Sequence, residues 1–187
     1  WNSWEGKSGV ELGAGLGLPS IVASNLGAKM TATDGDDKVL HLLGMNIERN
    51  APSCQVTKLL WGTAEPLAAL GLKQEPDFVL AADVVYGSDP AVWDALLETI
   101  KAVSGSSTLV VIANVCRTQC DARPFYKMVQ EDFKMKLLPQ SLLHPTFRGD
   151  GEGSCLIHVL RRRVKMQGFG TIRENLKMKS ASHPPPK

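Results

Sequence analysis

Short hydrophobic runs separated by turns recur along the chain and predict β-strands. In the segment 29–34, Met30 and Ala32 alternate with threonines, which is the two-residue period of a strand. The segments 78–82 and 108–115 are apolar at nearly every position, as in strands that are buried on both faces of a sheet. The predicted strands cover residues 10–12, 29–34, 56–61, 78–82, 108–115, 135–139 and 154–161.

Hydrophobic residues at three- and four-residue spacing predict amphipathic helices between most of these strands. The predicted helices cover residues 18–26, 36–50, 90–104 and 124–133. Because strands alternate with helices, we predict an α/β, Rossmann-like fold with a mostly parallel sheet covered by helices on both faces. No helix separates the last two predicted strands, so we expect this final pair to be antiparallel.

The composition indicates one globular domain. The chain has 187 residues, of which 43% are hydrophobic and 21% are charged, and this excludes a wholly disordered protein. Its longest apolar runs are far shorter than the roughly 20 residues of a membrane-spanning helix. The chain opens on Trp1, with no recognisable targeting peptide and no initiator Met at its start, so we expect a fragment. We expect the domain over residues 1–163 and a basic tail over residues 164–187.

The charge is distributed unevenly along the chain. Residues 161–187 carry eight Lys or Arg and one acid, a net +7, whereas residues 1–160 carry thirteen Lys or Arg and eighteen acids, a net −5. The C-terminal end is rich in Ser and Pro, so we expect a solvated, mobile tail. The alternative is a contact arm for RNA or an acidic partner, but no pattern of aromatic residues accompanies the charge. Nucleic acid and membrane are therefore not expected partners.

The four cysteines are few and irregularly spaced for a chain of this length. We interpret Cys54, Cys116, Cys120 and Cys155 as reduced thiols of an intracellular protein, cytoplasmic and also nuclear. A zinc site formed by three of these cysteines with His144 lacks the paired Cys or His spacing of known zinc motifs, so we predict no metal.

A glycine-rich turn after the first predicted strand indicates a nucleoside-binding site. Glycines at 13, 15 and 17 let the backbone approach a ligand closely, and the following helix exposes its N–H groups there. Asp34, seventeen residues after Gly17, ends the second predicted strand, where an acid can accept hydrogen bonds from ribose hydroxyls.

The details of this turn favour S-adenosylmethionine over a dinucleotide. The dinucleotide pattern requires a third glycine at position 18, which is Leu18. Glu11 lies within the preceding strand, where a carboxylate would repel a pyrophosphate. A carboxylate suits the ammonium and sulfonium groups of S-adenosylmethionine. A structural acid paired elsewhere remains the alternative for Glu11.

The same segment and four later motifs resemble the class I, seven-β-strand protein-lysine methyltransferases of the methyltransferase-like 21 type. The resemblance covers residues 6 to 163, and its most distinctive piece is the Asp-x-x-Tyr of 83–86. The matching segments are 10–20 (VELGAGLGLPS), 32–34 (ATD), 46–50 (NIERN), 60–62 (LWG) and 82–86 (ADVVY).

The resemblance implies a seven-stranded class I methyltransferase fold and roles for individual residues. Asp83 would orient the acceptor amine or pass its proton towards water, and the ring of Tyr86 would hold a partly cationic nitrogen. Arg117, Arg123 and Phe125 are similar to an Arg…Phe pattern of the family, without an assigned role. The implied cofactor-binding residues are Glu11, Gly13, Gly15, Gly17, Asp34, Trp61 and Ala82.

The function implied is S-adenosylmethionine-dependent methyl transfer to a lysine of a protein. The resemblance suggests an elongation factor or a chaperone as substrate and a monomeric enzyme. The family normally has a segment before the glycine turn that helps cover the cofactor, whereas nine residues precede Val10 here. Three alternatives stay open: a small-molecule or histidine methyltransferase, a nicotinamide-dependent oxidoreductase, and a catalytically inert binding module of the same fold.

Overall fold

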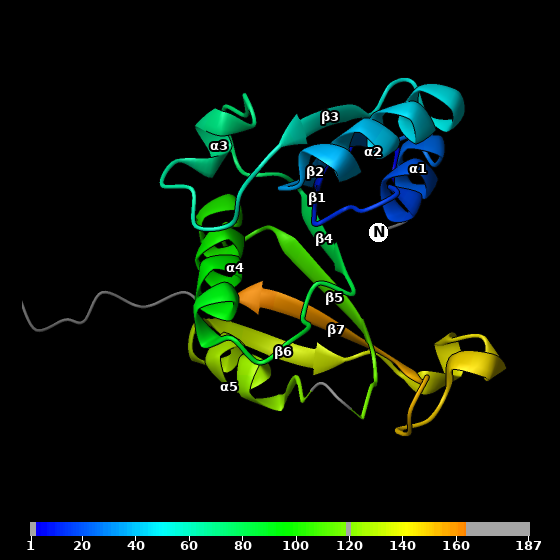
Figure 1. The fold of residues 1–187 in the computed structure, drawn as a ribbon, viewed down its shortest axis with the longest axis vertical. Coiled ribbons are helices and arrows are strands. Elements are labelled where there is room, and N and C mark those ends of the chain that lie inside the picture. Colours follow the sequence, from blue (N-terminus) through cyan, green and yellow to red (C-terminus); the bar gives the residue numbers. More distant parts are fainter. Residues whose placement is uncertain (1–2, 119–120, 164–187) are drawn as a thin grey trace, which may run out of the picture.

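The computed structural model describes residues 3–118 and 121–163, which form one seven-stranded sheet (Figure 1). The strand order across the sheet is β3-β2-β1-β4-β5-β7-β6. The strands are β1 (Ser8–Leu12), β2 (Lys29–Asp34), β3 (Gln55–Lys58), β4 (Phe78–Ala82), β5 (Leu109–Val115), β6 (Phe133–Leu137) and β7 (Cys155–Arg162).

The pairing confirms the predicted mixed sheet. The first five strands pair in parallel, so their carboxyl ends meet at one edge. β7 lies between β5 and β6 and runs antiparallel to both, as expected for strands joined without a helix. The strand order reverses direction between β1 and β4, and in open α/β sheets such a switch point is where ligands bind.

Five helices and two 3₁₀ turns connect these strands. Two of the helices are capped by the side chain of an aspartate: Asp36 accepts a hydrogen bond from Lys38 N, and Asp89 accepts one from Ala91 N. The helices are α1 (Leu18–Asn25), α2 (Asp37–Asn50), α3 (Pro66–Ala69), α4 (Pro90–Val103) and α5 (Arg123–Asp132), and the 3₁₀ turns are η1 (Gln140–Leu142) and η2 (Pro145–Phe147).

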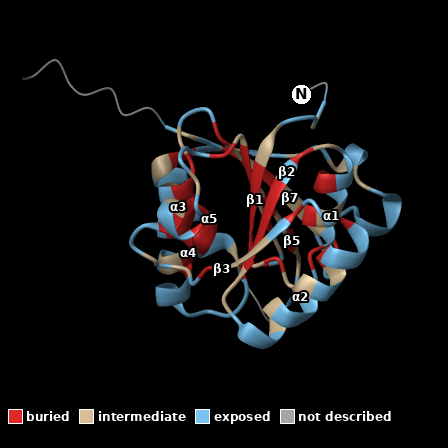
Figure 2. Ribbon diagram, turned by 90° about the horizontal axis from the view of Figure 1, so that it is seen from above, coloured by how far each residue is buried: buried red, intermediate tan, exposed pale blue. Residues whose placement is uncertain are grey.

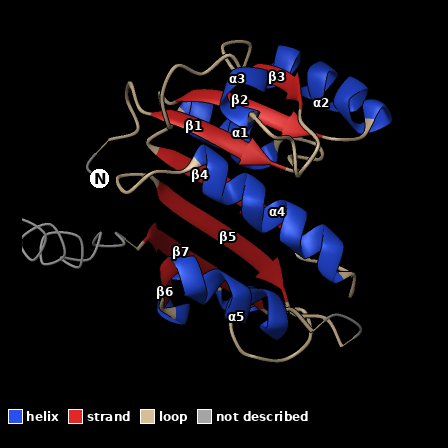
Figure 3. Cartoon of the chain, turned by 90° about the vertical axis from the view of Figure 1, so that its left-hand side faces the viewer, coloured by secondary structure: helices blue, strands red, loops and turns tan. Residues whose placement is uncertain are grey.

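The helices form a layer on each face of the sheet, and each layer has its own core (Figures 2 and 3). On one face, α4 and α5 pack against side chains of β1, β4 and β5 such as Leu12, Val79 and Ile112. On the other face, α1 and α2 pack against β2 through Met30 and Ala32. Successive residues of the central strands therefore alternate between two cores, which explains why β4 and β5 are apolar at nearly every position.

The clearest differences from the sequence prediction concern β3, α3 and β6, and β1 begins two residues earlier than expected, at Ser8. β3 ends at Lys58 instead of residue 61, because its partner β2 ends at Asp34, which lies opposite Lys58. The short helix α3 was not predicted, since four residues are too few to show helical periodicity. β6 begins at Phe133 directly after α5, two residues earlier than expected.

Within the described ranges, no helix combines the length and apolar character needed to cross a bilayer. Of the cysteines, Cys54, Cys116 and Cys155 are free thiols, and Cys120 lies outside the described residues. The basic tail predicted for residues 164–187 also lies outside them.

Candidate active site

The carboxyl ends of β1, β2 and β4 surround a cavity of about 660 Å³. The glycine turn follows β1, Asp34 ends β2 and Asp83 follows β4, so the parallel sheet brings together three segments that are far apart in sequence. Among the predicted site residues, those that line the cavity are Gly13, Gly15, Asp34, Trp61, Asp83 and Tyr86.

All three glycines of the turn have a left-handed backbone, and Gly13 and Gly15 face different surroundings. A Cβ added at Gly13 (φ +66°) would lie 2.9 Å from Val84 Cγ1 and 3.2 Å from Trp61 Cζ2. A Cβ added at Gly15 (φ +56°) would meet no atom within 4 Å. Gly15 thus leaves open space over the turn, and a ligand in the cavity can approach its backbone closely.

The carboxylate of Asp34 is oriented by two main-chain N–H groups. Gly15 N donates to Asp34 Oδ2 and Asp36 N donates to Asp34 Oδ1, each at 3.1 Å. Both oxygens retain lone pairs, because a carboxylate can accept about four hydrogen bonds. The side chain is therefore held at the cavity with capacity for two hydroxyl donors, as a ribose requires.

Trp61 lies over the glycine turn because β3 ends early. Leu59 N donates to Asp34 O at 2.9 Å, and the chain then leaves the sheet towards the cavity. Leu60 remains 59% exposed there, and the partly buried ring of Trp61 packs against the core next to Gly13. An aromatic ring and an exposed apolar side chain are suitable walls for an adenine ring.

Asp83 forms a two-point ion pair with Arg117, which follows β5. Arg117 Nη1 donates to Asp83 Oδ1 at 2.6 Å, and Arg117 Nη2 donates to Asp83 Oδ2 at 2.5 Å. The hydrogen bonds and charge of Arg117 hold the pKa of the Asp83 carboxyl below its usual value, although partial burial opposes this. Asp83 is therefore an ionised carboxylate at neutral pH.

A second cavity, of about 630 Å³, lies between the ends of β5 and β7 and α5. Arg117 lines it, so the Asp83–Arg117 pair connects the two cavities. Its buried wall is formed by Asn114, Tyr126 and His158. Burial lowers the pKa of His158, which is therefore neutral at pH 7, and its ring centroid lies 3.9 Å from that of Tyr126.

Three of the predicted cofactor residues lie outside the lining of the first cavity. Gly17 and Ala82 sit at the ends of the glycine turn and of β4. The carboxylate of Glu11 is buried and accepts hydrogen bonds from Ser20 in α1. The sheet alternation explains this position, since Glu11 points to the α1 face while Val10 and Leu12 point to the α4 face.

Sequence reasoning did not identify two contributors to this region. Asn114 Nδ2 donates to Val85 O at 2.9 Å and so braces the loop that carries Asp83 and Tyr86. The sign of Asn114 in the sequence was a polar amide side chain within the otherwise apolar segment 108–115. Arg117 was noted without a role, because only the parallel pairing of β4 and β5 brings its side chain to Asp83.

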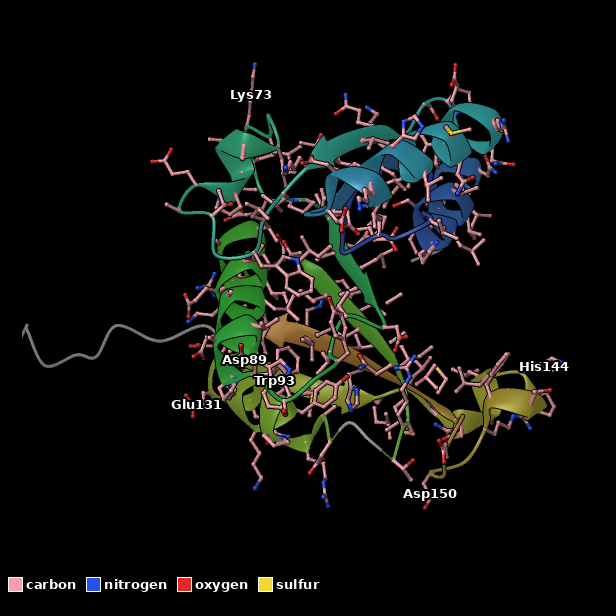
Figure 4. The ribbon with its side chains drawn as sticks, in the orientation of Figure 1. Lys73, Asp89, Trp93, Glu131, His144 and Asp150 are labelled. Atoms are coloured by element: carbon pink, nitrogen blue, oxygen red, sulfur yellow. The ribbon has the colours of Figure 1, made fainter. Side chains whose placement is uncertain are left out.

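The part of the chain that the structure describes contains no cluster of potential metal ligands. No group of three or more His, Cys, Asp or Glu side chains there is arranged to hold a metal ion. His144, from the zinc hypothesis, lies in the loop between β6 and β7 and points outward at its far end (Figure 4).

The fold is shared with solved methyltransferases. A TehB-like S-adenosylmethionine-dependent methyltransferase from Corynebacterium glutamicum superposes with a TM-score of 0.66 at 15% identity, over 85% of this chain and 82% of that chain. At this identity the likeness shows the class I methyltransferase fold alone.

The sequence is also similar to curated lysine methyltransferases. It is 37% identical over 124 residues to the zebrafish protein N-lysine methyltransferase METTL21A, covering 64% of this chain and 54% of the relative. It is 31% identical over 127 residues to the Xenopus tropicalis EEF1A lysine methyltransferase 3, covering 66% of this chain and 54% of the relative. The chain thus spans about half the length of these relatives.

A family model described as "Lysine methyltransferase" matches residues 2–132. The matched range contains the glycine turn, Asp34, Trp61 and the Asp83–Tyr86 motif, together with Arg117. The chain therefore belongs to the lysine methyltransferase family.

Proposed function

We propose that this protein transfers a methyl group from S-adenosylmethionine to a lysine side chain of a protein substrate. The observation that carries the proposal is the position of the Asp83–Arg117 pair between two cavities. The first cavity has the features of a nucleoside site, and the second leaves room for an acceptor.

The residues of the first cavity fit the cofactor. Asp34 offers free lone pairs for the ribose hydroxyls, Gly15 leaves its backbone accessible, and Trp61 with Leu60 provides an apolar wall for the adenine. When bound, S-adenosylmethionine supplies a methyl group on a positively charged sulfur. Gly13, Gly17, Glu11 and Ala82 would support the site by shaping the turn and the strand ends.

The acceptor lysine would reach the junction through the second cavity. Asp83 is a catalytic residue in this proposal, because its carboxylate would accept a hydrogen bond from the amine and orient the nitrogen lone pair. Tyr86, whose side chain is 58% exposed at the mouth of the first cavity, would hold the nitrogen against its ring face as positive charge develops.

The substrate would be a protein, and elongation factor 1A is the first candidate. The Xenopus relative is named for its action on EEF1A, and it matches two thirds of this chain. We infer the substrate from this relative alone, so a test must also allow other proteins to be labelled.

Calorimetry with S-adenosylhomocysteine is the first step of the test, and micromolar binding is expected. The purified chain is then incubated with tritiated S-adenosylmethionine and either unmodified EEF1A or a whole-cell lysate. Mass spectrometry of the labelled bands should locate the methyl group on lysine. Label on histidine or on a small molecule, or no binding at all, would contradict the proposal.

Asp83→Ala is expected to abolish labelling while cofactor affinity changes less than threefold. Glu131→Ala is the matched control, because Glu131 is an exposed acid of α5 that lies at the outside of the molecule (Figure 4) and lines neither cavity. Full labelling by the Asp83 variant would show that its carboxylate has no part in the reaction.

A further inference from the structure

We propose that Arg117 is a positioning residue for methyl transfer: it holds the Asp83 carboxylate in place and disfavours the ammonium form of the acceptor lysine. This inference rests on the proposed function. It adds an explanation of how the acceptor lysine loses its proton before it attacks the methyl group. It concerns a residue of the second cavity, on the side away from the glycine turn.

The geometry fixes the guanidinium next to the acceptor position. Both carboxylate oxygens of Asp83 accept from Arg117, at 2.6 and 2.5 Å, which leaves the two planar groups little freedom to rotate. The backbone of Asp83 is itself constrained, since its φ is +59° and its N–H donates to Ala113 O at 2.6 Å. A left-handed aspartate held by its main chain and its side chain points in one direction only.

The chemistry of the acceptor explains why a cation is useful at this place. A lysine in water has a pKa of about 10.4, and its ammonium has no lone pair with which to attack carbon. A carboxylate by itself would stabilise the ammonium and raise the pKa of the lysine further. The Asp83–Arg117 pair has no net charge, so the lysine can lose its proton to water while one oxygen of Asp83 still accepts from the amine.

Asp83 itself is unsuited to keep that proton. Its pKa lies below the usual value because of the hydrogen bonds from Arg117, so at neutral pH it stays ionised and the proton goes to solvent. Arg117 cannot take the proton either, since a guanidinium remains charged at all working pH values.

Other titratable groups surround the Asp83–Arg117 pair on both sides and contribute to the pH dependence of the site. On the side of the first cavity, the charged groups are Asp34 and Asp36, with Tyr86 at the mouth. On the side of the second cavity, the charged groups are Asp121, Arg123, Lys127 and Asp150. Cys116, Tyr126 and His158 also line this side, and burial together with the charges of Cys116 and Asp83 raises the pKa of the Cys155 thiol of β7.

The pH profile of methyl transfer tests the inference. Initial rates of tritium incorporation into EEF1A, or into lysate protein if EEF1A is not the acceptor, are measured from pH 6.5 to 9.5. In Arg117→Ala, the lone carboxylate should shift the profile to higher pH by about one unit, because it now stabilises the ammonium. The rate should then fall about tenfold at pH 7.5, and the variant should need a pH about one unit higher to reach any given wild-type rate. Arg117→Lys keeps the charge without the two-point geometry and should lie between them.

Arg123→Ala is the matched control. Arg123 lines the same cavity and pairs with Asp121 at 2.7 Å, so its removal takes away the same charge without touching Asp83. Its profile should keep the wild-type position on the pH axis, whatever its height. An Arg117→Ala profile with unchanged position, or with a higher rate at pH 7.5, would overturn the inference and identify Arg117 as inert or as an obstruction.

A measurement without turnover separates this inference from the proposed function. The carboxyl ¹³C resonance of Asp83 is titrated by NMR in the wild type and in Arg117→Ala, and the pKa should rise towards its ordinary value in the variant. Identical titration curves would show that Arg117 does not hold Asp83. If the wild type transfers no methyl group but the curves differ, the proposed function fails while the ion pair stands.

Discussion

The carboxylate of Glu11 accepts two hydrogen bonds from Ser20, one from its N–H at 2.9 Å and one from its hydroxyl at 2.5 Å. These bonds tie the carboxyl-terminal end of β1 to the first turn of α1, next to the glycine turn that joins the two elements. Burial raises the pKa of Glu11 to about 7, although the bonds from Ser20 act in the opposite direction.

This buried acid makes the free energy of unfolding depend on pH. The unfolded chain loses the Glu11 proton near its ordinary pKa of 4.5, whereas the folded chain keeps it until about 7. Stability should therefore fall as the pH rises from 4.5 to 7 and level off above, by a total of about 3 kcal/mol. Glu11→Gln should remove this decline in urea denaturation curves recorded from pH 5 to 8. Glu48→Gln, on the exposed face of α2, is the control and should show the same decline of stability with pH as the wild type. If the decline persists in Glu11→Gln, another titratable group causes it.

Alanine at Gly13 and at Gly15 should have different effects, although both positions have positive φ. Gly15→Ala adds a methyl group to open space, so its melting temperature should drop slightly while its affinity for S-adenosylhomocysteine falls at least tenfold. Gly13→Ala would clash with Val84 and should lower the melting temperature much further. Calorimetry and thermal denaturation on both variants check this, and unaltered affinity in Gly15→Ala would place the ligand elsewhere.

Asp34→Ala should weaken S-adenosylhomocysteine binding by about 10- to 100-fold, because one or two hydrogen bonds to a charged acceptor are lost. Asp34→Asn retains one oxygen acceptor and should lose less. Asp37→Ala is the control: this neighbouring acid pairs with Lys58 at 2.7 Å and does not line the cavity. The affinities come from calorimetry, and equal losses in the Asp34 and Asp37 variants would indicate a nonspecific charge effect.

Asn114→Ala should reduce methyl transfer through the loop that carries Asp83 and Tyr86. The variant loses the hydrogen bond from Asn114 Nδ2 to Val85 O, and we expect about 1–3 kcal/mol less stability with cofactor affinity preserved. Tyr126→Phe removes only the longer contact of 3.4 Å to Asn114 Oδ1 and should have a smaller effect. Urea denaturation and labelling rates are measured on both variants. A larger loss of stability or of labelling rate in Tyr126→Phe than in Asn114→Ala would contradict this role.

The sequence by itself determined the fold class and the location of the candidate nucleoside site. Strand and helix periodicities differ, and glycines, prolines and acidic caps mark the ends of elements, so most boundaries agreed within two residues. The glycine turn, Asp34 and Asp83 could be placed together because the carboxyl ends of parallel strands share one edge of a sheet. The element boundaries follow from local sequence patterns, and the grouping of these residues follows from a general rule of sheet topology.

Only the tertiary structure decided which way individual side chains point. Whether Glu11 faces the cavity or α1 depends on which face of β1 each helix covers, and a two-residue period has no preferred face until the helices pack. The contact between Asp83 and Arg117 joins residues 34 positions apart and exists because β4 and β5 are paired in one register. Such contacts between distant segments arise from packing, and no local pattern along the chain encodes them.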